Sequence, residues 1–187
     1  LKHQSQEKTL VVVCASGGGI QAAGWTTEVL TGLQNEELLG TSFTKAIGLI
    51  SAVSGGAVGT MYYLDRFGSQ GYPENTELEN IFNSATRDSL DATGWGLAYP
   101  DLWRIIALPI LPSLLSPKIG DRGIALETDW QGEMKNPHQG KTLATWRSQI
   151  LQGEIPIPIF NATLVEDGNR FLVTPMTFSE SSEKKYL

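Results

Sequence analysis

Two short apolar runs, each followed at once by small residues, constrain the fold of this chain more than any other feature. Residues 9–15, TLVVVCA, precede a glycine triplet, and residues 46–53, AIGLISAV, precede a Ser-Gly-Gly corner. Continuous apolar runs of this length are typical of strands buried on both faces of a parallel sheet. Apolar residues at helical spacing follow in 26–40, where Gly40 is the predicted end, and in 57–67. This alternation of strand and helix predicts an α/β fold with a mostly parallel sheet.

The remaining residues carry three more helical patterns and one hairpin signal. The helical patterns cover 77–90, 121–134 and 141–154, and Asp121 is a candidate N-cap of the second. Two β-like runs flank Asp-Gly within 160–175. This dipeptide favours the tight turns that join antiparallel strands, so these residues are predicted to form a hairpin.

Length and charge restrict the class of protein. The 187 residues are enough for one domain with a core, which we expect to span residues 1–187. The formal charge is −6 without a cluster of Lys and Arg, so we expect no nucleic-acid partner. Cys14 is the one cysteine, which excludes an internal disulfide, and its apolar setting predicts a small buried residue. The chain starts at Leu1 rather than Met, and we expect further residues of the protein outside it.

No stretch of the sequence reaches the roughly 18–20 unbroken apolar residues of a membrane-spanning helix. Residues 102–116 are strongly apolar but are interrupted by Pro109 and Pro112. These residues are compatible either with a hydrophobic core covered by loops or with a surface patch that inserts into a lipid surface. We therefore expect a cytoplasmic protein or one in peripheral contact with a membrane.

The corner after the second apolar run matches a nucleophile elbow, a sharp turn between strand and helix that lifts a serine hydroxyl out of the backbone. The usual pattern is G-x-S-x-G, because the residues two before and two after the serine must be small. Around Ser54 these positions hold Ala52 and Gly56, whereas Ser51 has larger residues at both. Ser54 is therefore the candidate nucleophile, and a plain glycine-rich turn is the alternative.

Gly17, Gly18 and Gly19 follow the first run and precede a helical segment. Three consecutive glycines are costly in conformational entropy and suit a place where backbone N–H groups approach a ligand closely. A helix N-terminus adds positive potential there, so the triplet can bind a phosphate or stabilise an oxyanion in acyl transfer. Adjacent parallel strands bring their carboxyl ends to one edge of a sheet, so we expect the triplet and Ser54 to lie side by side.

A nucleotide- or phosphate-binding βαβ module is the rival interpretation of the same glycines. Gly17, Gly19 and Ala22 match G-x-G-x-x-G/A, but the second predicted strand does not end in the Asp or Glu that would hold a ribose. A P-loop would need Gly-Lys-Ser/Thr after the triplet, and this sequence lacks it. The glycine match therefore does not specify a nucleotide site by itself.

Together, SGGGIQAA and AVSGGAVG resemble the patatin-like phospholipases and acyl hydrolases, in the bacterial branch near the cytosolic phospholipases. DRGIALETDW and FNATLVEDGNRFLV resemble segments of the bacterial relatives. The resemblance implies a three-layer α/β sandwich, incomplete at its C-terminus here, and an enzyme of lipid degradation that hydrolyses fatty-acyl esters without a cofactor or metal. It assigns Ser54 as the nucleophile of a Ser–Asp dyad and the amides of Gly17, Gly18 and Gly19 as the oxyanion hole.

Two positions depart from the family's pattern. The family's arginine after the triplet, thought to meet the lipid phosphate, corresponds to Gln21, which can hydrogen-bond a phosphate but cannot neutralise it. The D-G-G or D-G-A motif of the dyad aspartate is absent, and the one Asp-Gly pair, at Asp167, falls in the predicted hairpin turn. We expect the dyad aspartate to lie beyond Leu187. A catalytically inactive domain that serves in protein interactions stays an alternative.

A Ser–His–Asp triad is the other mechanism that the sequence allows. The two histidines are His3, in a polar N-terminal stretch, and His138, in a polar loop. The order Ser54, then Asp121 or Asp129, then His138 is that of an α/β-hydrolase. A histidine in a surface loop is more often only solvated, so the dyad is the preferred mechanism.

Overall fold

The structure is a computed structural model that describes residues 9–35, 37–98, 122–136 and 142–177. The chain forms two compact units, one of residues 1–86 and 141–187 and the other of residues 87–140. The first unit contains the sheet and the candidate site. In the second unit, the described residues form the helices α5 (Leu90–Gly96) and α8 (Arg122–Gly132).

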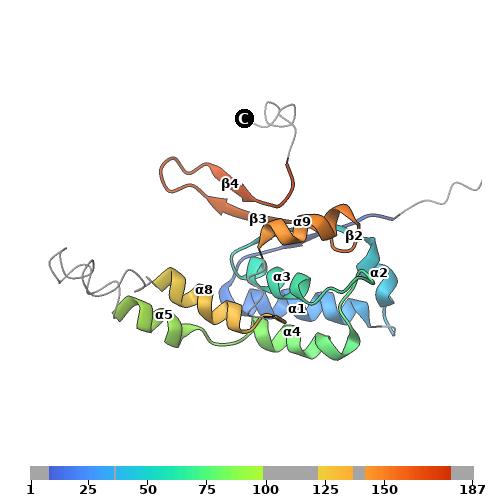
Figure 1. The fold of residues 1–187 in the computed structure, drawn as a ribbon, viewed down its shortest axis with the longest axis horizontal. Helices are drawn as coiled ribbons and strands as arrows, with labels where there is room; N and C mark the ends of the chain where they lie inside the picture. The colour runs from blue at the N-terminus through green and yellow to red at the C-terminus, as the bar shows by residue number, and fades with distance from the viewer. Residues whose placement is uncertain (1–8, 36, 99–121, 137–141, 178–187) are drawn as a thin grey trace, which may run out of the picture. The chain divides into compact units, whose positions relative to one another are not determined.

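A four-stranded sheet organises the first unit (Figure 1). Its strands are β1 (Val11–Ala15), β2 (Ile47–Val53), β3 (Ile157–Thr163) and β4 (Arg170–Val173), in that spatial order. β1 is parallel to β2 and β2 is parallel to β3, whereas β3 and β4 form an antiparallel hairpin. The predicted α/β class, the mostly parallel sheet and the hairpin around Asp-Gly are therefore confirmed.

The predicted helices of this unit are present in the predicted order with shifted ends, and α2 is an additional helix. The helices of the first unit are α1 (Gly19–Gln34), α2 (Gly40–Ala46), α3 (Gly55–Asp65), the 3-10 helix η1 (Asn75–Glu77), α4 (Leu78–Ala85) and α9 (Leu143–Leu151). Figure 1 shows α1, α3 and α4 on the same side of the sheet.

Two of the predicted helices have different bounds in the structure. The helix predicted over 26–40 starts at Gly19, directly after the first two glycines of the triplet, and ends before Asn35. Gly40 begins α2 with φ of 67° instead of ending α1, since glycine adopts this left-handed conformation without a Cβ penalty. The helix predicted over 77–90 is limited to Leu78–Ala85.

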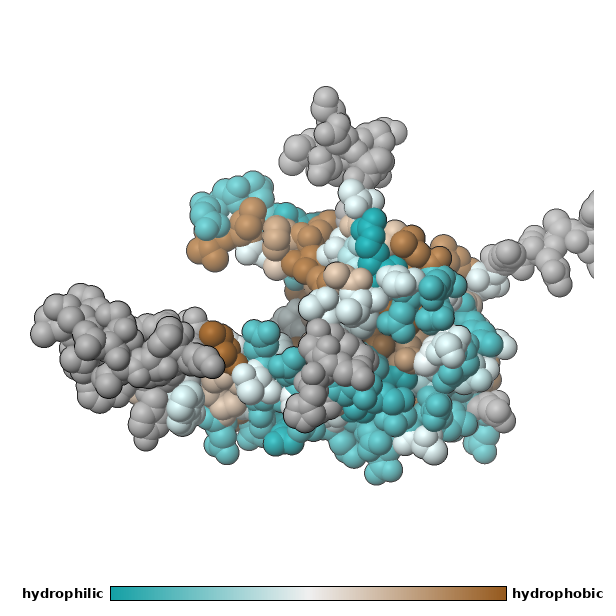
Figure 2. Space-filling model, in the orientation of Figure 1, coloured by the Kyte–Doolittle hydropathy of each residue, from teal (hydrophilic) through white to brown (hydrophobic). Residues whose placement is uncertain are grey.

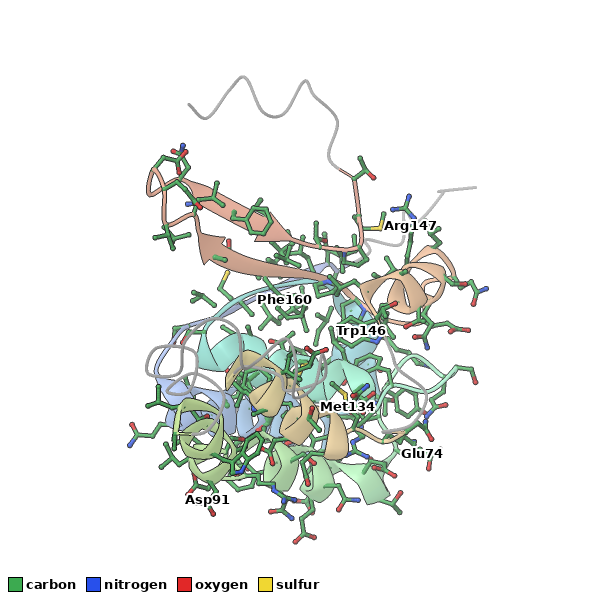
Figure 3. The ribbon with its side chains drawn as sticks, turned by 60° about the vertical axis from the view of Figure 1, so that its left-hand side comes forward. Glu74, Asp91, Met134, Trp146, Arg147 and Phe160 are labelled. Carbon is green, nitrogen blue, oxygen red and sulfur yellow. The ribbon has the colours of Figure 1, made fainter. Side chains whose placement is uncertain are left out.

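The core lies between the sheet and the helices. Ile50 of β2, Tyr63 of α3 and Ile81 of α4 have no exposed surface, and burial of each isoleucine side chain stabilises the fold by about 1.5–3 kcal/mol. Burial raises the pKa of the Tyr63 phenol above its usual value, because the charged phenolate is disfavoured away from water. α9 adds Trp146, whose ring centroid lies 6.5 Å from that of Phe160 in β3 (Figure 3).

The other face of β1 is exposed. Val13 pairs with Ile50 and faces the core, whereas Val12 is 56% exposed and Cys14 is also exposed. The predictions that this strand is buried on both faces and that Cys14 is buried are therefore wrong. The physical reason is that the described helices of this unit pack against the face that carries Ile50 and Ala52.

Hydrophobic side chains also reach the surface on the β3–β4 hairpin (Figure 2). Val165 at its turn is almost fully exposed, and Phe171 on β4 is about half exposed. The apolar residues 102–116 lie outside the described residues. No helix in the described segments is long and apolar enough to cross a membrane.

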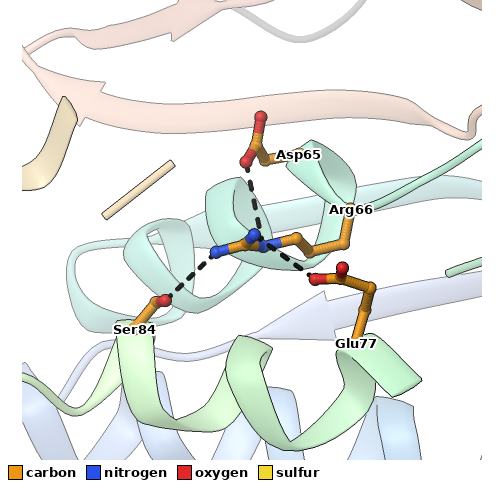
Figure 4. Close-up of polar contacts among 4 residues, drawn as sticks. All are labelled: Asp65, Arg66, Glu77 and Ser84. Atoms are coloured by element: carbon orange, nitrogen blue, oxygen red, sulfur yellow. Dashed lines mark hydrogen bonds and ion pairs between the residues drawn. The ribbon is translucent and has the colours of Figure 1, made fainter. Parts of the chain in front are cut away.

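A buried ionic cluster connects the end of α3 to η1 and α4 (Figure 4). The Arg66 guanidinium lies 3.9 Å from the Asp65 carboxylate and 3.3 Å from that of Glu77, and it donates a hydrogen bond of 3.3 Å to the Ser84 hydroxyl. Arg66 and Asp65 are both buried. Charges of this kind are retained in a low-dielectric interior only when they are paired, so Arg66 is a structural residue of the first unit.

Candidate functional site

Ser54 occupies the junction of β2 and α3 in a strained conformation. Its φ of 52° and ψ of −123° make it the one described non-glycine residue with positive φ. A conformation of this kind costs on the order of 1–3 kcal/mol and persists only where the surroundings enforce it. Ser54 is exposed, and its backbone carbonyl accepts hydrogen bonds from the N–H groups of Ala57 at 2.9 Å and Val58 at 3.2 Å. Ser54 therefore lies at the surface in a strained turn between strand and helix.

Glycines let this turn pack directly on the backbone of the loop between β1 and α1. A Cβ at Gly55 would lie 2.0 Å from the carbonyl oxygen of Gly19. A Cβ at Gly56 would lie 2.5 Å from the carbonyl oxygen of Ser16. Both distances are far below van der Waals contact, so neither position can hold a side chain without moving the loop. Backbone-to-backbone packing thus requires glycine at positions 55 and 56.

The glycine triplet and Ser54 meet at the carboxyl edge of the sheet, as expected from the parallel pairing of β1 and β2. A Cβ built on Gly17 would lie 3.2 Å from the Ser54 Cβ and 3.8 Å from its Oγ. Gly18 and Gly19 have φ of 150° and 60°, which L side chains rarely adopt. Gln21 lies exposed in the first turn of α1.

Two helix N-termini also come together here. α1 begins at Gly19 and α3 begins at Gly55, two residues whose backbones are in contact. Neither helix has a side-chain hydrogen bond at its N-cap or an acidic residue in its first turn. The N–H groups and the positive ends of both helix dipoles therefore favour negative charge at this point. An exposed alcohol beside such a group of donors suits attack on a carbonyl group.

The carboxylates of the alternative mechanisms make other hydrogen bonds or, like the histidines, lie outside the described residues. Asp167 accepts hydrogen bonds from the backbone and side chain of Asn169, at 2.9 and 2.6 Å, within the hairpin turn. Asp129 lies in the second unit and accepts a hydrogen bond of 2.7 Å from Ser89. His3, His138 and Asp121 lie outside the described residues. No group of three or more potential metal ligands occurs in the segments that the structure describes.

Asn161 is a residue of this region that the sequence interpretation missed. It pairs with Val53 across β2 and β3, and its side-chain amide donates hydrogen bonds to the Ser51 Oγ at 3.0 Å and to the Ala52 carbonyl at 3.1 Å. Asparagine is depleted in strands, so its presence in an otherwise β-like run was the available signal.

The close packing around Gly55 predicts that one added methyl group at this position destabilises the protein. We expect Gly55→Ala to lower the free energy of unfolding by about 1–3 kcal/mol, because the added methyl group would overlap the Gly19 carbonyl oxygen. Urea denaturation would measure this change. Gly32→Ala in α1 is the matched control, since nothing lies within 4 Å of its new Cβ, and it should stabilise by about 0.5–1 kcal/mol. Equal stability of Gly55→Ala and the parent would contradict the packing.

Comparisons with known proteins bear on the fold. No family model matches the chain, and no curated protein matches it. Among solved structures it is similar to human GIVD cytosolic phospholipase A2 in complex with methyl gamma-linolenyl fluorophosphonate, at 14% identity and a TM-score of 0.55. A structure of the same human protein with this inhibitor and terbium chloride matches at 16% identity and a TM-score of 0.51. Each match covers 90% of this chain and 23% of the phospholipase chain. The chain therefore has an α/β fold similar to part of a phospholipase.

Proposed function

We propose that this chain forms the nucleophile-bearing part of a serine acyl hydrolase that cleaves fatty-acyl esters of lipids. The observation that carries the proposal is the strained, exposed Ser54 beside Gly17, at the point where the N-termini of α1 and α3 meet. Ser54 is the proposed nucleophile. The backbone amides of Gly17, Gly18 and Gly19 are the proposed oxyanion hole, and Gln21 is a proposed contact for the lipid head group.

The proposed reaction proceeds in two acyl transfers. The Ser54 Oγ attacks the ester carbonyl carbon and loses its proton to a general base, while the carbonyl oxygen takes up negative charge near the glycine amides. Collapse of this intermediate expels the alcohol, which takes the proton, and leaves an acyl-serine. Water then attacks the acyl-serine, and the fatty acid leaves as Ser54 regains a proton. An aspartate is the proposed base, and the turn contacts of Asp167 favour another aspartate of the protein in this role.

The structural neighbours support a lipid substrate. The similar human protein is a phospholipase whose structure contains a fluorophosphonate with a linolenyl chain. Fluorophosphonates react with activated serines because the tetrahedral phosphorus resembles the intermediate of acyl transfer. By this likeness we propose that the chain acts on long acyl esters and contacts lipid surfaces peripherally. The neutral Gln21 side chain is compatible with esters that lack a charged head group.

A fluorophosphonate probe tests the proposal directly. We expect the complete protein to form one covalent adduct on Ser54, identified by peptide mass spectrometry, and we expect Ser54→Ala to abolish it. Ser51→Ala is the matched control, since Ser51 lies three residues away in β2, and it should leave labelling at Ser54. An adduct on another serine, or no adduct, would overturn the assignment.

A phosphate- or nucleotide-binding module is the second candidate, because two uncapped helix N-termini and a glycine triplet also suit a phosphate. Thermal unfolding in the presence of nucleoside triphosphates or inorganic phosphate separates the two functions. A rise in Tm with nucleotide, together with an unreactive Ser54, would favour this second function.

A further inference from the structure

We infer that Asn161 is a positioning residue for Ser54, an inference that rests on the proposed function. Asn161 lies on β3, opposite Val53, the residue immediately before the candidate nucleophile. Its Nδ2 group donates to the Ala52 carbonyl at 3.1 Å and to the Ser51 Oγ at 3.0 Å, and it lies 3.4 Å from the carbonyl oxygen of Ile159. The Asn161 side chain is therefore hydrogen-bonded to the end of β2, the strand that leads into Ser54.

The strained backbone of Ser54 needs support on both sides. A residue at φ of 52° and ψ of −123° relaxes if the peptide groups before or after it rotate. After Ser54, its own carbonyl is held by the N–H groups of Ala57 and Val58 in the first turn of α3. Before Ser54, the bond from Asn161 fixes the orientation of the peptide group between Ala52 and Val53, which is one peptide group away from Ser54. Asn161 therefore restrains the end of β2 that leads into the turn.

The chemistry of this contact requires an amide. The Ala52 carbonyl can only accept, so the group that faces it must be a donor, and the Asn161 NH₂ supplies two hydrogens that three nearby acceptors share. A carboxylate at position 161 would place a negative oxygen against the Ala52 carbonyl oxygen. Ser51 is the second acceptor, but its hydroxyl can turn to serve either role, so the bond to the Ala52 backbone is the one that fixes the strand end.

The test compares Asn161→Asp, which keeps the side-chain shape, with Asn161→Leu, which keeps its size without hydrogen bonds. We expect both to slow fluorophosphonate labelling of Ser54 by about 100-fold, the effect of misplacing a reacting group by about 1 Å. For a soluble acyl ester, kcat should fall while KM changes less than about three-fold, because the substrate-binding groups stay in place.

Two controls distinguish positioning from general loss of stability. Ser51→Ala keeps the bond from Asn161 to the Ala52 carbonyl and should label at a rate within about three-fold of the parent. Ile81→Val lowers stability by about 0.5–1.5 kcal/mol at a core position on α4 and should leave the labelling rate unchanged. Parent-like rates in both Asn161 variants, or an equal fall in Ile81→Val, would overturn the inference. Absence of labelling in the parent would instead overturn the proposed function.

Discussion

Replacing Ser54 with glycine is expected to remove ester hydrolysis and, at the same time, to stabilise the protein by about 1 kcal/mol. Glycine adopts φ of 52° and ψ of −123° without the strain that a Cβ imposes, a gain on the order of 1–3 kcal/mol. The greater freedom of glycine in the unfolded chain offsets about 0.5–1 kcal/mol of this gain. Loss of a catalytic serine lowers kcat by up to about 10⁶-fold. The strain would then be a cost in stability that activity requires.

Ser54→Ala is the matched variant, because it also lacks the hydroxyl but keeps the Cβ. Urea denaturation should place Ser54→Gly above Ser54→Ala in stability by about 1 kcal/mol, while both variants lack activity toward an acyl ester. If the two variants were equally stable, the strain at position 54 would be disproved. If Ser54→Gly retained hydrolysis, the role of this residue as nucleophile would be disproved.

Replacing Arg66 with methionine is expected to lower the free energy of unfolding by about 3–5 kcal/mol. The change keeps most of the side-chain volume but removes the charge that lies 3.9 Å from the Asp65 carboxylate and 3.3 Å from that of Glu77. Asp65 is 1% exposed and Arg66 is 8% exposed, so the change removes a positive charge beside a carboxylate that solvent hardly reaches. A loss of this size is a large part of the stability of an ordinary domain and would be seen as a lower midpoint in urea.

The ion pair of Arg87 with Glu133 provides the control for Arg66. The Arg87 side chain is 55% exposed, so Arg87→Met should change stability by less than about 1 kcal/mol. Arg66→Lys keeps the charge but not the forked geometry, and we expect a loss between those of the two methionine variants. A loss below about 1 kcal/mol for Arg66→Met would show that the cluster in Figure 4 does not stabilise the fold.

Local sequence patterns correctly predicted most strands and turns of the sheet. The apolar runs predicted β1 and β2, the Asp-Gly pair predicted the β3–β4 hairpin, and parallel pairing predicted that Gly17 and Ser54 meet at one edge. These predictions succeed because period, turn preference and strand direction depend on residues close together in the chain. The role of Ser54 as nucleophile stays a prediction that labelling must test.

Other features depend on contacts between residues far apart in the sequence, which no local pattern specifies. The apolar setting of Cys14 predicts burial, but the structure exposes it because the described helices pack on the opposite face of β1. Asn161 reaches Ser51 and Ala52 across about 110 residues of sequence, and only the register of β3 against β2 brings them together. The sequence alone thus determined which segments form strands and turns. Tertiary structure decided which faces are covered and which side chain hydrogen-bonds the end of β2 before Ser54, since burial and hydrogen bonds depend on distance in space.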